Sequence, residues 1–586
     1  MQPPPLHDVD ALVLAEDGRR WLRFTRPHGL LTANTPGDVP ALLREVEQQT
    51  KARNCHAVGY LTYEAGAAYG LHVRPPDGHV PLAAFALFSS GLVSSSELPP
   101  NGHPHAVGRA LPTWDRATYL ERFDRIKRHI ADGDTYQVNC TFALEAPFRG
   151  EPHALFRALL RSQRGRYATW LRLGDLAICS ASPELFFCRR GHRLLSRPMK
   201  GTARRGRTMA EDAAAVEALR RSRKERAENV MIVDMVRNDL GRIAQVGSVE
   251  VVRLFEAEKY PTVWQMVSEV ACNSDAGLDE IMAAMFPSAS ITGAPKARTM
   301  EIIAALEDRP RGVYTGTIGH VGPTGDATFN VAIRTAVIDA ARESLTFGVG
   351  SGVVWDSAGE AEYDECLLKG AVLTAAAPEF ELLETLGWAP DRGYTVLDRH
   401  VQRLEQSAAY FDIGHHPASL RAALDRAVAG ATEPQRVRVL VAENGAVRSE
   451  SVPLAPSVEP ARVRLAQTPI DSTDRFLFHK TTRRAAYESR LEPDVDDVLL
   501  WNERGELTES TIANVVVELD GVLVTPPVAS GLLAGTLRAE LLETGKVVER
   551  TVAVDDLTRA TGLWLVSSLR GWRRAVVVER APTAAR

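Results

Sequence analysis

The sequence lacks the features that mark membrane-embedded and secreted proteins. Among its 586 residues, 45% are hydrophobic, yet no apolar run approaches the roughly 18 residues of a membrane span. The opening Met1-Gln-Pro-Pro-Pro-Leu6 has neither the charged nor the apolar region of a signal peptide. Six cysteines are scattered without paired spacing, which fits neither a disulfide framework nor a zinc site. We therefore expect a cytoplasmic protein with no membrane partner.

An excess of charge of one sign is also missing. The chain has 69 Lys and Arg against 74 Asp and Glu, so the formal net charge is −5 and no nucleic-acid partner is expected. Basic runs such as Arg220-Arg-Ser-Arg-Lys-Glu-Arg226 are typical of solvated helix faces. The length excludes a single ordinary core and predicts about two to four domains.

Hydrophobic patterns divide the chain into two parts. Residues 1–110 alternate short apolar runs with turn residues, which predicts mainly strands. A helical stripe begins at Asp115 and places apolar side chains at three- and four-residue spacing. Pro378 interrupts helix and Phe380 opens a new pattern, so we place a domain boundary near residues 376–381. The predicted domains are residues 1–378 and 382–586.

Six short motifs follow one another within residues 115–375. They are Ser182-Pro-Glu-Leu185, Ser196-Arg-Pro-Met-Lys-Gly-Thr202, Glu228-Asn-Val-Met-Ile-Val-Asp-Met-Val-Arg-Asn-Asp-Leu-Gly241, Phe286-Pro-Ser-Ala-Ser-Ile-Thr-Gly-Ala-Pro-Lys296, Ala332-Ile-Arg-Thr335, and Gly350-Ser-Gly-Val-Val354 with Glu362-Tyr-Asp-Glu365. In this order they resemble the chorismate-utilising enzymes, the family of anthranilate synthase and aminodeoxychorismate synthase component I. The resemblance implies an antiparallel α/β sandwich for the N-terminal domain, within an α/β (α+β) chain, and chorismate as substrate.

Lys200 is the residue that distinguishes the reactions of the family from one another. Anthranilate-forming relatives usually carry alanine at this position, whereas aminodeoxychorismate synthases with a covalent mechanism carry lysine. The resemblance therefore implies that Lys200 attacks the ring at C2 and expels the C4 hydroxyl. A solvated surface lysine is the ordinary alternative for any single lysine.

The same resemblance assigns the groups that would bind chorismate and a metal ion. It implies Mg²⁺ held by Glu228 and Glu365, with Glu225 and Glu362 in supporting positions. Glutamates three residues apart can share a helix face, although such pairs are often only a solvated surface. Arg334 is implied to clamp a substrate carboxylate. The other implied substrate contacts are Gly201, Thr202, Tyr314, Gly350, Ser351 and Gly352.

Two departures from the family matter for the mechanism. Gln265 stands where many relatives have histidine, and glutamine cannot act as a general acid. This position also argues against pyruvate elimination in the first domain. No segment resembles a glutamine amidotransferase, so the resemblance implies that ammonia comes from a separate subunit or from free ammonium.

The C-terminal part contains four further motifs in order. They are His400-Val-Gln-Arg-Leu404, Phe478-His-Lys-Thr-Thr482, Thr508-Glu-Ser-Thr-Ile-Ala-Asn514 and Leu533-Ala-Gly-Thr-Leu-Arg538. They resemble the fold-type IV pyridoxal-phosphate enzymes, which have two subdomains and include aminodeoxychorismate lyase and two groups of aminotransferases. The resemblance implies that Lys480 binds the cofactor covalently and Glu509 holds the pyridine nitrogen. The implied phosphate contacts are Arg403, Thr536, Leu537, Ser567 and Ser568.

Three functions remain open from the sequence. The favoured one is a bifunctional enzyme that aminates chorismate to 4-amino-4-deoxychorismate and then eliminates pyruvate to form 4-aminobenzoate for folate. An anthranilate-type synthase fused to a branched-chain or D-amino acid aminotransferase is the enzyme alternative. A catalytically inactive scaffold, with residues 1–110 binding an amino acid regulator, is the third. A homodimer through the C-terminal domain is compatible with each of them.

Overall fold

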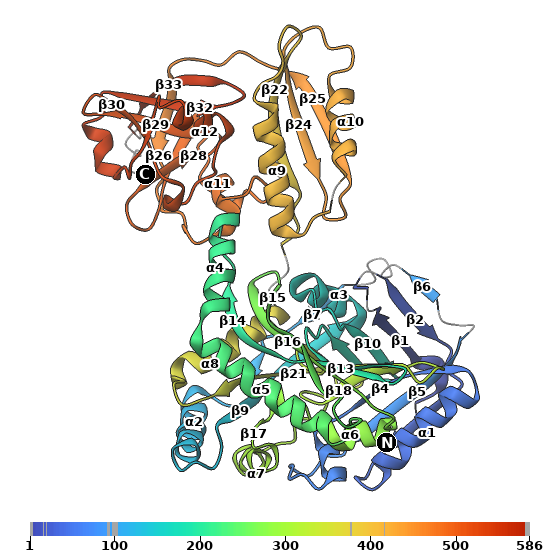
Figure 1. Ribbon diagram of the computed structural model, residues 1–586. Coiled ribbons are helices and arrows are strands. Elements are labelled where there is room, and N and C mark those ends of the chain that lie inside the picture. The colour runs from blue at the N-terminus through green and yellow to red at the C-terminus, as the bar shows by residue number, and fades with distance from the viewer. Residues whose placement is uncertain are drawn as a thin grey trace. The chain divides into compact units, whose positions relative to one another are not determined.

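The computed structural model describes residues 4–15, 17–18, 20–90, 94–96, 104–374, 378–414 and 416–579 (Figure 1). The chain forms two compact units. The first comprises residues 1–204 and 216–377, and the second comprises residues 205–215 and 378–586. The division after Ala377 lies within the interval where the sequence places a boundary, whereas the segment 205–215 was not anticipated.

The first unit is built on two large antiparallel sheets. In spatial order, the strands of one sheet are β17 (Gly293–Ala294), β9 (Gln137–Gly150), β21 (Ser344–Val353), β20 (Thr335–Asp339), β11 (Leu176–Ser180), β10 (Thr169–Leu173), β1 (Val9–Leu14), β2 (Trp21–Thr25) and β6 (Ser94–Ser96), with β7 (His105–Val107) and β8 (Leu111–Pro112) paired to β9. The other sheet contains β14 (Met199–Arg204), β16 (Val263–Asn273), β13 (Arg193–Arg197), β12 (Leu185–Arg190), β19 (Ala327–Val331), β18 (Thr317–Val321), β4 (Cys55–Leu61), β5 (Ala83–Ser89) and β3 (Gly29–Ala33), with β15 (Glu250–Lys259) paired to β16.

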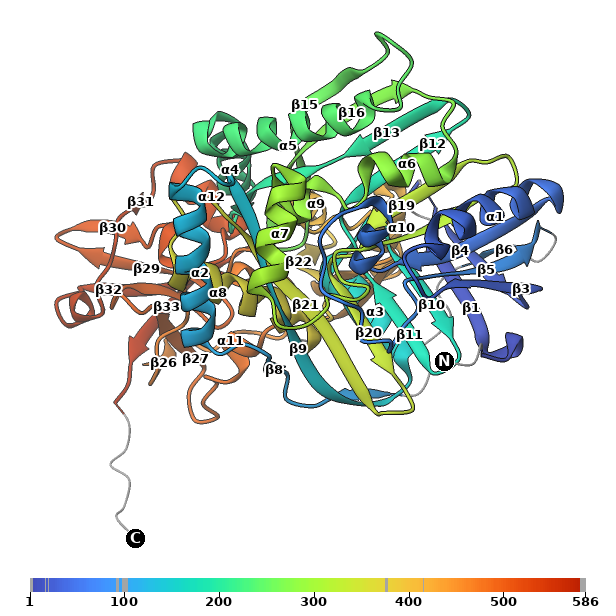
Figure 2. The same cartoon turned by 90° about the horizontal axis from the view of Figure 1, so that it is seen from below.

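The two sheets pack face to face and helices cover their outer faces (Figures 1 and 2). Val9 and Phe24 from one sheet and Val58 and Tyr60 from the other are buried together in the apolar layer between the sheets. The helices on the β9–β21 side are α2 (Arg116–Ala131), α3 (Pro152–Gln163), α7 (Lys296–Leu306) and α8 (Gly359–Gly370). The helices on the β16 side are α1 (Asp38–Ala52), α5 (Arg223–Gly241) and α6 (Leu278–Met285). This is the antiparallel α/β sandwich that the motifs predicted.

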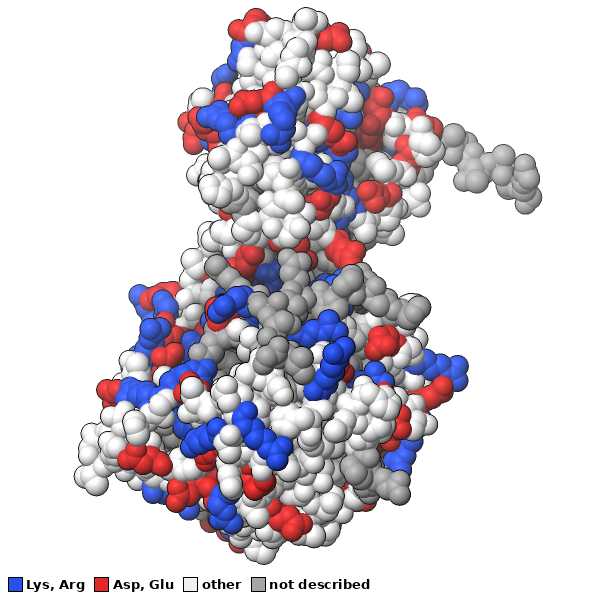
Figure 3. Space-filling model, turned by 90° about the vertical axis from the view of Figure 1, so that its right-hand side faces the viewer, with Lys and Arg blue, Asp and Glu red and all other residues white. Residues whose placement is uncertain are grey.

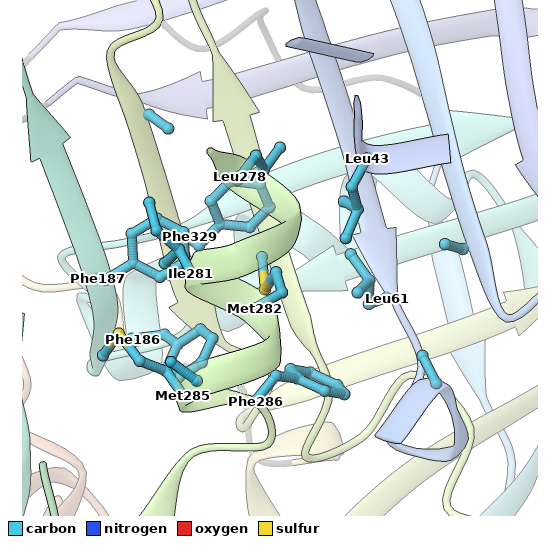
Figure 4. Close-up of a cluster of buried hydrophobic side chains, with 14 of the residues drawn as sticks. Leu43, Leu61, Phe186, Phe187, Leu278, Ile281, Met282, Met285, Phe286 and Phe329 are labelled. Carbon is cyan, nitrogen blue, oxygen red and sulfur yellow. The ribbon is translucent and has the colours of Figure 1, made fainter. Parts of the chain in front are cut away.

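Helix α6 shows how one of these outer layers is held. Leu278, Ile281, Met282 and Met285 recur at helical spacing and are buried. They face aromatic side chains of strands β12 and β19, including Phe329 (Figure 4). Burying each large apolar side chain contributes about 1.5–3 kcal/mol, so the amphipathic sequence fixes this helix to its sheet.

Local sequence signals predict some elements of the first unit and miss others. The predicted helix at Asp115 is confirmed as α2, whose N-cap Asp115 accepts a hydrogen bond from the Thr118 amide. Its buried stripe comprises Tyr119, Phe123 and Ile126. Residues 1–110 include the 15-residue helix α1, which a reading of this region as mainly strands overlooked.

The second unit has two sheets and therefore two subdomains, as the motifs predicted. The smaller sheet consists of β23 (Gly393–Tyr394), β22 (Leu382–Ala389), β24 (Gln435–Val441) and β25 (Val447–Pro453), packed with α9 (Leu397–Phe411) and α10 (Pro417–Ala427). The larger mixed sheet consists of β28 (Leu507–Ser510), β27 (Asp497–Trp501), β26 (Ala461–Leu465), β33 (Gly571–Val577), β32 (Gly562–Ser567), β29 (Asn514–Leu519), β30 (Val522–Thr525) and β31 (Val548–Glu549). Two helices accompany this sheet, α11 (Ala485–Glu488) and α12 (Thr536–Glu543).

The segment 205–215 contains the beginning of α4 (Met209–Arg221) and contributes to the second unit's core. The Tyr410 hydroxyl donates a 2.6 Å hydrogen bond to the Gly206 carbonyl. His479 Nε2 donates one of 3.1 Å to the Arg207 carbonyl, and Arg205 lies 4.4 Å over the Tyr410 ring. Residues 205–215 lie between two motifs of the first domain in the sequence. In the structure they contact His479, the residue before Lys480.

The surface has no single dominant charge on the face shown in Figure 3, where acidic and basic side chains are interspersed. Among the helices of the described residues, none is long and apolar enough to cross a membrane.

Candidate active sites

Lys200 lies on β14, among charged and polar side chains of the first unit. Its Nζ is 3.6 Å from Glu228 Oε2 on α5, and both side chains are 17% exposed. A Cβ built on Gly352 of β21 would lie 2.5 Å from this Nζ, so a larger residue there would displace the lysine amine. The lysine is thus an enclosed amine beside a carboxylate, and not a solvated surface side chain.

Two buried groups near Lys200 were not singled out by the sequence. The amide of Gln137 on β9 is fully buried, and none of the described residues bonds its nitrogen or its oxygen. Its Nε2 is 3.3 Å from the same Cβ position on Gly352 that Lys200 approaches. Glu184, from the first motif, is 3% exposed, and its Oε1 likewise lacks a partner among the described residues. Buried polar groups without hydrogen bonds destabilise the folded protein. A polar ligand that bonds the Gln137 amide and Glu184 would remove this destabilisation.

Burial raises the pKa of Glu184 to about 7, against hydrogen bonds from Ser290 and the Met199 amide and the attraction of Lys200. A carboxyl group with this pKa is partly protonated near neutral pH. It can therefore donate a proton, which Gln265 cannot do. The Gln265 amide oxygen instead accepts a 3.1 Å hydrogen bond from Thr202 across the β14–β16 pair.

The four predicted metal-binding glutamates lie in two places. Glu225 and Glu228 are on α5, and burial together with the charge of Glu228 raises the pKa of Glu225. Glu362 and Glu365 are on α8, and Glu365 pairs with Lys369 at 2.6 Å. In the part of the chain that the structure describes, no three His, Cys, Asp or Glu side chains are grouped closely enough to hold a metal ion.

Arg334 is a buried cation that precedes β20 and lies near Glu365. Burial lowers its pKa, and the charges of Tyr314 and Glu365 oppose that shift. Its Nη1 donates a 3.2 Å hydrogen bond to the Lys369 carbonyl, and no described carboxylate lies within ion-pair distance. Lys369 Nζ also donates to the Gly350 carbonyl at 2.8 Å. Two cations therefore border the glycines of β21, and one of them has no partner of opposite charge.

The remaining predicted substrate contacts are spread along two strands. Gly201 has φ +106°, and a Cβ there would meet Glu225 Oε2 at 3.1 Å. Gly350 lies against Thr141, while the Tyr314 ring covers Gly348 further along β21. The Ser351 hydroxyl instead pairs with Tyr119 at 3.0 Å, on the opposite face of the strand.

The second site is built around Lys480 and Glu509. Burial lowers the pKa of Lys480 to about 8, and the positive charge of Arg403 adds to this shift. Burial raises the pKa of Glu509 to about 7. The Glu509 carboxylate accepts hydrogen bonds from the Tyr487 hydroxyl at 2.9 Å and the Leu533 amide at 3.1 Å. An amine that loses its proton easily therefore lies near a well-oriented buried acid.

Arg403 on α9 forms a two-point ion pair with Glu384 of β22, at 2.8 and 2.7 Å. The same carboxylate contacts His400 Nδ1 at 2.7 Å. Burial raises the pKa of Glu384, but the charge of Arg403 and the hydrogen bonds to His400 and Arg403 together lower it to about 2. Glu384 and His400 orient the predicted phosphate-binding arginine, and the sequence did not reveal either role.

The other predicted phosphate contacts meet at His400 and the start of α12. His400 Nε2 lies 2.8 Å from the Ser568 hydroxyl and 3.3 Å from that of Thr536. Gly535 is the N-cap of α12, so Thr536 and Leu537 occupy its first turn, where backbone amides are free to bind an anion. Ser567 accepts a hydrogen bond from the Arg570 amide at 3.3 Å.

Comparison with known proteins matches a family model to each of the two parts of the chain. Residues 10–375 match the model of the chorismate binding enzyme family. The chain belongs to this family. Residues 381–578 match the model of class IV aminotransferases, so the chain joins two families, as the motifs predicted.

Individual relatives add detail on the first unit. Aminodeoxychorismate synthase of Streptomyces griseus is 44% identical over 274 residues, which cover 46% of this chain and 37% of the relative. Anthranilate synthase component 1 1 of Haloarcula marismortui is 42% identical over 266 residues, which cover 45% and 54%. The chain thus spans about half or less of these relatives' lengths.

A solved structure supports the fold of the first unit. Anthranilate synthase component I from Streptococcus pneumoniae TIGR4 has a TM-score of 0.53 and 22% identity, covering 61% of this chain and 92% of that one. The aminodeoxychorismate synthase and the anthranilate synthase are almost equally identical to this chain. The assignment of the product therefore depends on individual residues, Lys200 above all.

Proposed function

We propose that the chain is a bifunctional enzyme that converts chorismate to 4-amino-4-deoxychorismate and then to 4-aminobenzoate and pyruvate. The observation that carries the proposal is the enclosure of Lys200 between Glu228 and the unpaired amide of Gln137. An amine in that position can act as a nucleophile. The class IV aminotransferase half supplies a site of the kind that the second reaction needs.

In the first reaction, Lys200 Nζ forms a bond to ring C2, both ring double bonds shift toward C4, and the C4–O bond breaks. Glu228, 3.6 Å from Nζ, would stabilise the positive charge of the bonded amine, and Glu184 can give a proton to the departing hydroxide. Ammonia then bonds to C4, both double bonds shift back, Lys200 leaves C2 as the free amine, and the new ammonium at C4 returns a proton to Glu184. Arg334 and Lys369 balance the two substrate carboxylates.

Ammonia is the second substrate of this reaction, and its source is another protein or free ammonium. One relative is named a component 1, and this name implies a further component. We propose a glutamine amidotransferase as that partner.

We propose Mg²⁺ as the cation that lies between substrate and glutamates. The repulsion between Glu225 and Glu228 is relieved by a divalent cation, which oxygen ligands favour. A substrate carboxylate and water molecules would complete the coordination, since Mg²⁺ usually keeps several waters. Glu228 and Glu365 are the proposed protein ligands.

The residues of the second site fit pyridoxal phosphate. Lys480 would link to its aldehyde, Glu509 would hold its pyridine nitrogen, and Arg403 with the first turn of α12 would bind its phosphate. When bound, the cofactor supplies an electron sink for the carbon that bears the substrate amine.

Lys480 is the residue placed to move protons in the elimination. Its amine, once released by the substrate amine, can take the proton from C4. It returns a proton as the C3–O bond breaks, pyruvate leaves and the ring becomes aromatic. The pKa of about 8 suits both proton transfers near neutral pH.

Product analysis of the intact chain tests this proposal. The protein would be incubated with chorismate, ammonium chloride, Mg²⁺ and pyridoxal phosphate, and the products identified by mass. We expect 4-aminobenzoate and pyruvate in equal amounts, without an amino acid or oxo acid as co-substrate. Anthranilate as the product, or transamination of branched-chain or D-amino acids by the second site, would replace this proposal with the fused-aminotransferase alternative.

Replacing Glu184 with glutamine is expected to lower the synthase turnover by about a hundredfold or more, the usual contribution of a general acid. The parent's rate should fall as pH rises through about 7, because Glu184 loses its proton there. This decline should be absent in Glu184→Gln and retained in Glu184→Asp. Parental turnover and an unchanged pH profile in Glu184→Gln would assign proton donation to another group.

Replacing Glu365 with glutamine is expected to raise the Mg²⁺ concentration for half-maximal synthase activity about tenfold, because the amide removes a charge that the cation needs. Glu360→Gln is a matched control, since Glu360 is 64% exposed on the same helix and pairs with Arg116. The ligand assignment fails if both variants titrate with Mg²⁺ like the parent.

A further inference from the structure

Arg484 is a cation of the second site that the proposed cofactor contacts do not use. It immediately precedes α11, four residues after Lys480. Its guanidinium donates a hydrogen bond to the Thr511 carbonyl and lies 4.6 Å over the Tyr487 ring. The Tyr487 hydroxyl in turn donates to Glu509 at 2.9 Å. Arg484 is thus fixed against the residues that surround Glu509.

The charge of Arg484 is not balanced within the site. Arg403 and Arg484 are the two arginines whose charges act on Lys480. Arg403 is neutralised by its two-point ion pair with Glu384. For Arg484, by contrast, no carboxylate lies within ion-pair distance among the described residues. One hydrogen bond to a carbonyl and a stacked ring compensate only part of the hydration that a half-buried guanidinium loses, which favours an anionic ligand.

We propose that Arg484 binds a carboxylate of the cyclic substrate in the second site and so selects that substrate. This inference rests on the proposed lyase function, whose substrate carries two carboxylates. The phosphate of the cofactor would have its own partners, Arg403 and the first turn of α12. Only one of the five N–H donors of Arg484 is known to be used, so a planar fork remains for a carboxylate.

The adjacent Arg483 provides a matched control. It is exposed and lies 4.5 Å over the Phe476 ring. Removing Arg483 deletes the same side chain one residue away. Both alanine variants remove one positive charge from the protein. A difference between their KM values is therefore caused by the position of Arg484 in the site.

The test is a steady-state assay of the intact chain with 4-amino-4-deoxychorismate. Arg484→Ala should raise KM at least tenfold with a smaller change in kcat. Arg484→Lys should lie between it and the parent, because a point charge replaces the fork. Arg483→Ala should match the parent. The absorbance of bound pyridoxal phosphate should be unchanged in Arg484→Ala and reduced after dialysis in Arg403→Ala.

Binding without turnover gives a second measurement. In the intact Lys480→Ala protein, calorimetry should show that adding Arg484→Ala weakens the affinity for 4-amino-4-deoxychorismate at least tenfold. Parental KM and affinity in Arg484→Ala would overturn the inference, as would a loss or shift of cofactor absorbance, which would assign Arg484 to the cofactor. A parent that does not convert the substrate would contradict the proposed function instead.

Discussion

Replacing Lys200 with alanine is expected to abolish the formation of 4-amino-4-deoxychorismate, with a loss on the order of 10³-fold or more, as for other removed nucleophiles. The alanine side chain leaves Glu228 and Gln137 in place but offers no atom that can bond to C2. Conversion of supplied 4-amino-4-deoxychorismate to 4-aminobenzoate should continue, because that reaction depends on Lys480. Both rates are measured by mass spectrometry of the products.

Two further variants distinguish nucleophilic attack by Lys200 from a purely electrostatic effect of its positive charge. Lys200→Arg keeps a cation but should be as inactive as alanine, since the guanidinium stays protonated. Lys224→Ala removes an exposed lysine near Glu225 and should match the parent. Intact-protein mass analysis with chorismate should show an adduct that is absent from both Lys200 variants. Full synthase activity in Lys200→Ala would exclude a covalent mechanism.

Replacing Lys480 with alanine is expected to remove lyase activity by a similarly large factor while leaving the synthase reaction intact. The visible-edge absorbance of bound pyridoxal phosphate should disappear after dialysis, because the covalent link requires this amine. The intact chain is the right material, since residues 205–215 belong to the second unit and contact His479. Retained absorbance after dialysis would place the covalent link on another lysine.

Glu509→Ala gives the complementary result. This variant should retain part of the cofactor, since Lys480 and Arg403 remain, but lose turnover because the pyridine nitrogen is no longer held protonated. Its folding can be checked by thermal unfolding, since Tyr487 and the Leu533 amide both lose their acceptor. Parental turnover in Glu509→Ala would contradict its assignment to the pyridine nitrogen.

The motifs in the sequence were sufficient to predict the two-family architecture and the neighbourhoods of Lys200 and Lys480. These motifs lie on short, regular segments whose local geometry is set by nearby residues. Gly201, for example, adopts a left-handed φ, a local backbone conformation that favours glycine. Asp115 likewise caps its helix through a side chain that bonds three residues on.

Only the tertiary structure decided which distant groups complete each site. Strand β9 pairs with β21 in a register that places Asn139 opposite Gly352. This register brings Gln137, two residues before Asn139, close to Gly352 and Lys200. Glu384 is brought to Arg403 by the packing of α9 on β22. Neither contact has a local sequence signal, since a lone glutamine or glutamate is usually exposed. Long-range pairing thus determined the unpaired amide, the raised pKa of Glu184 and the free charge of Arg484, because all three depend on burial by residues remote in sequence.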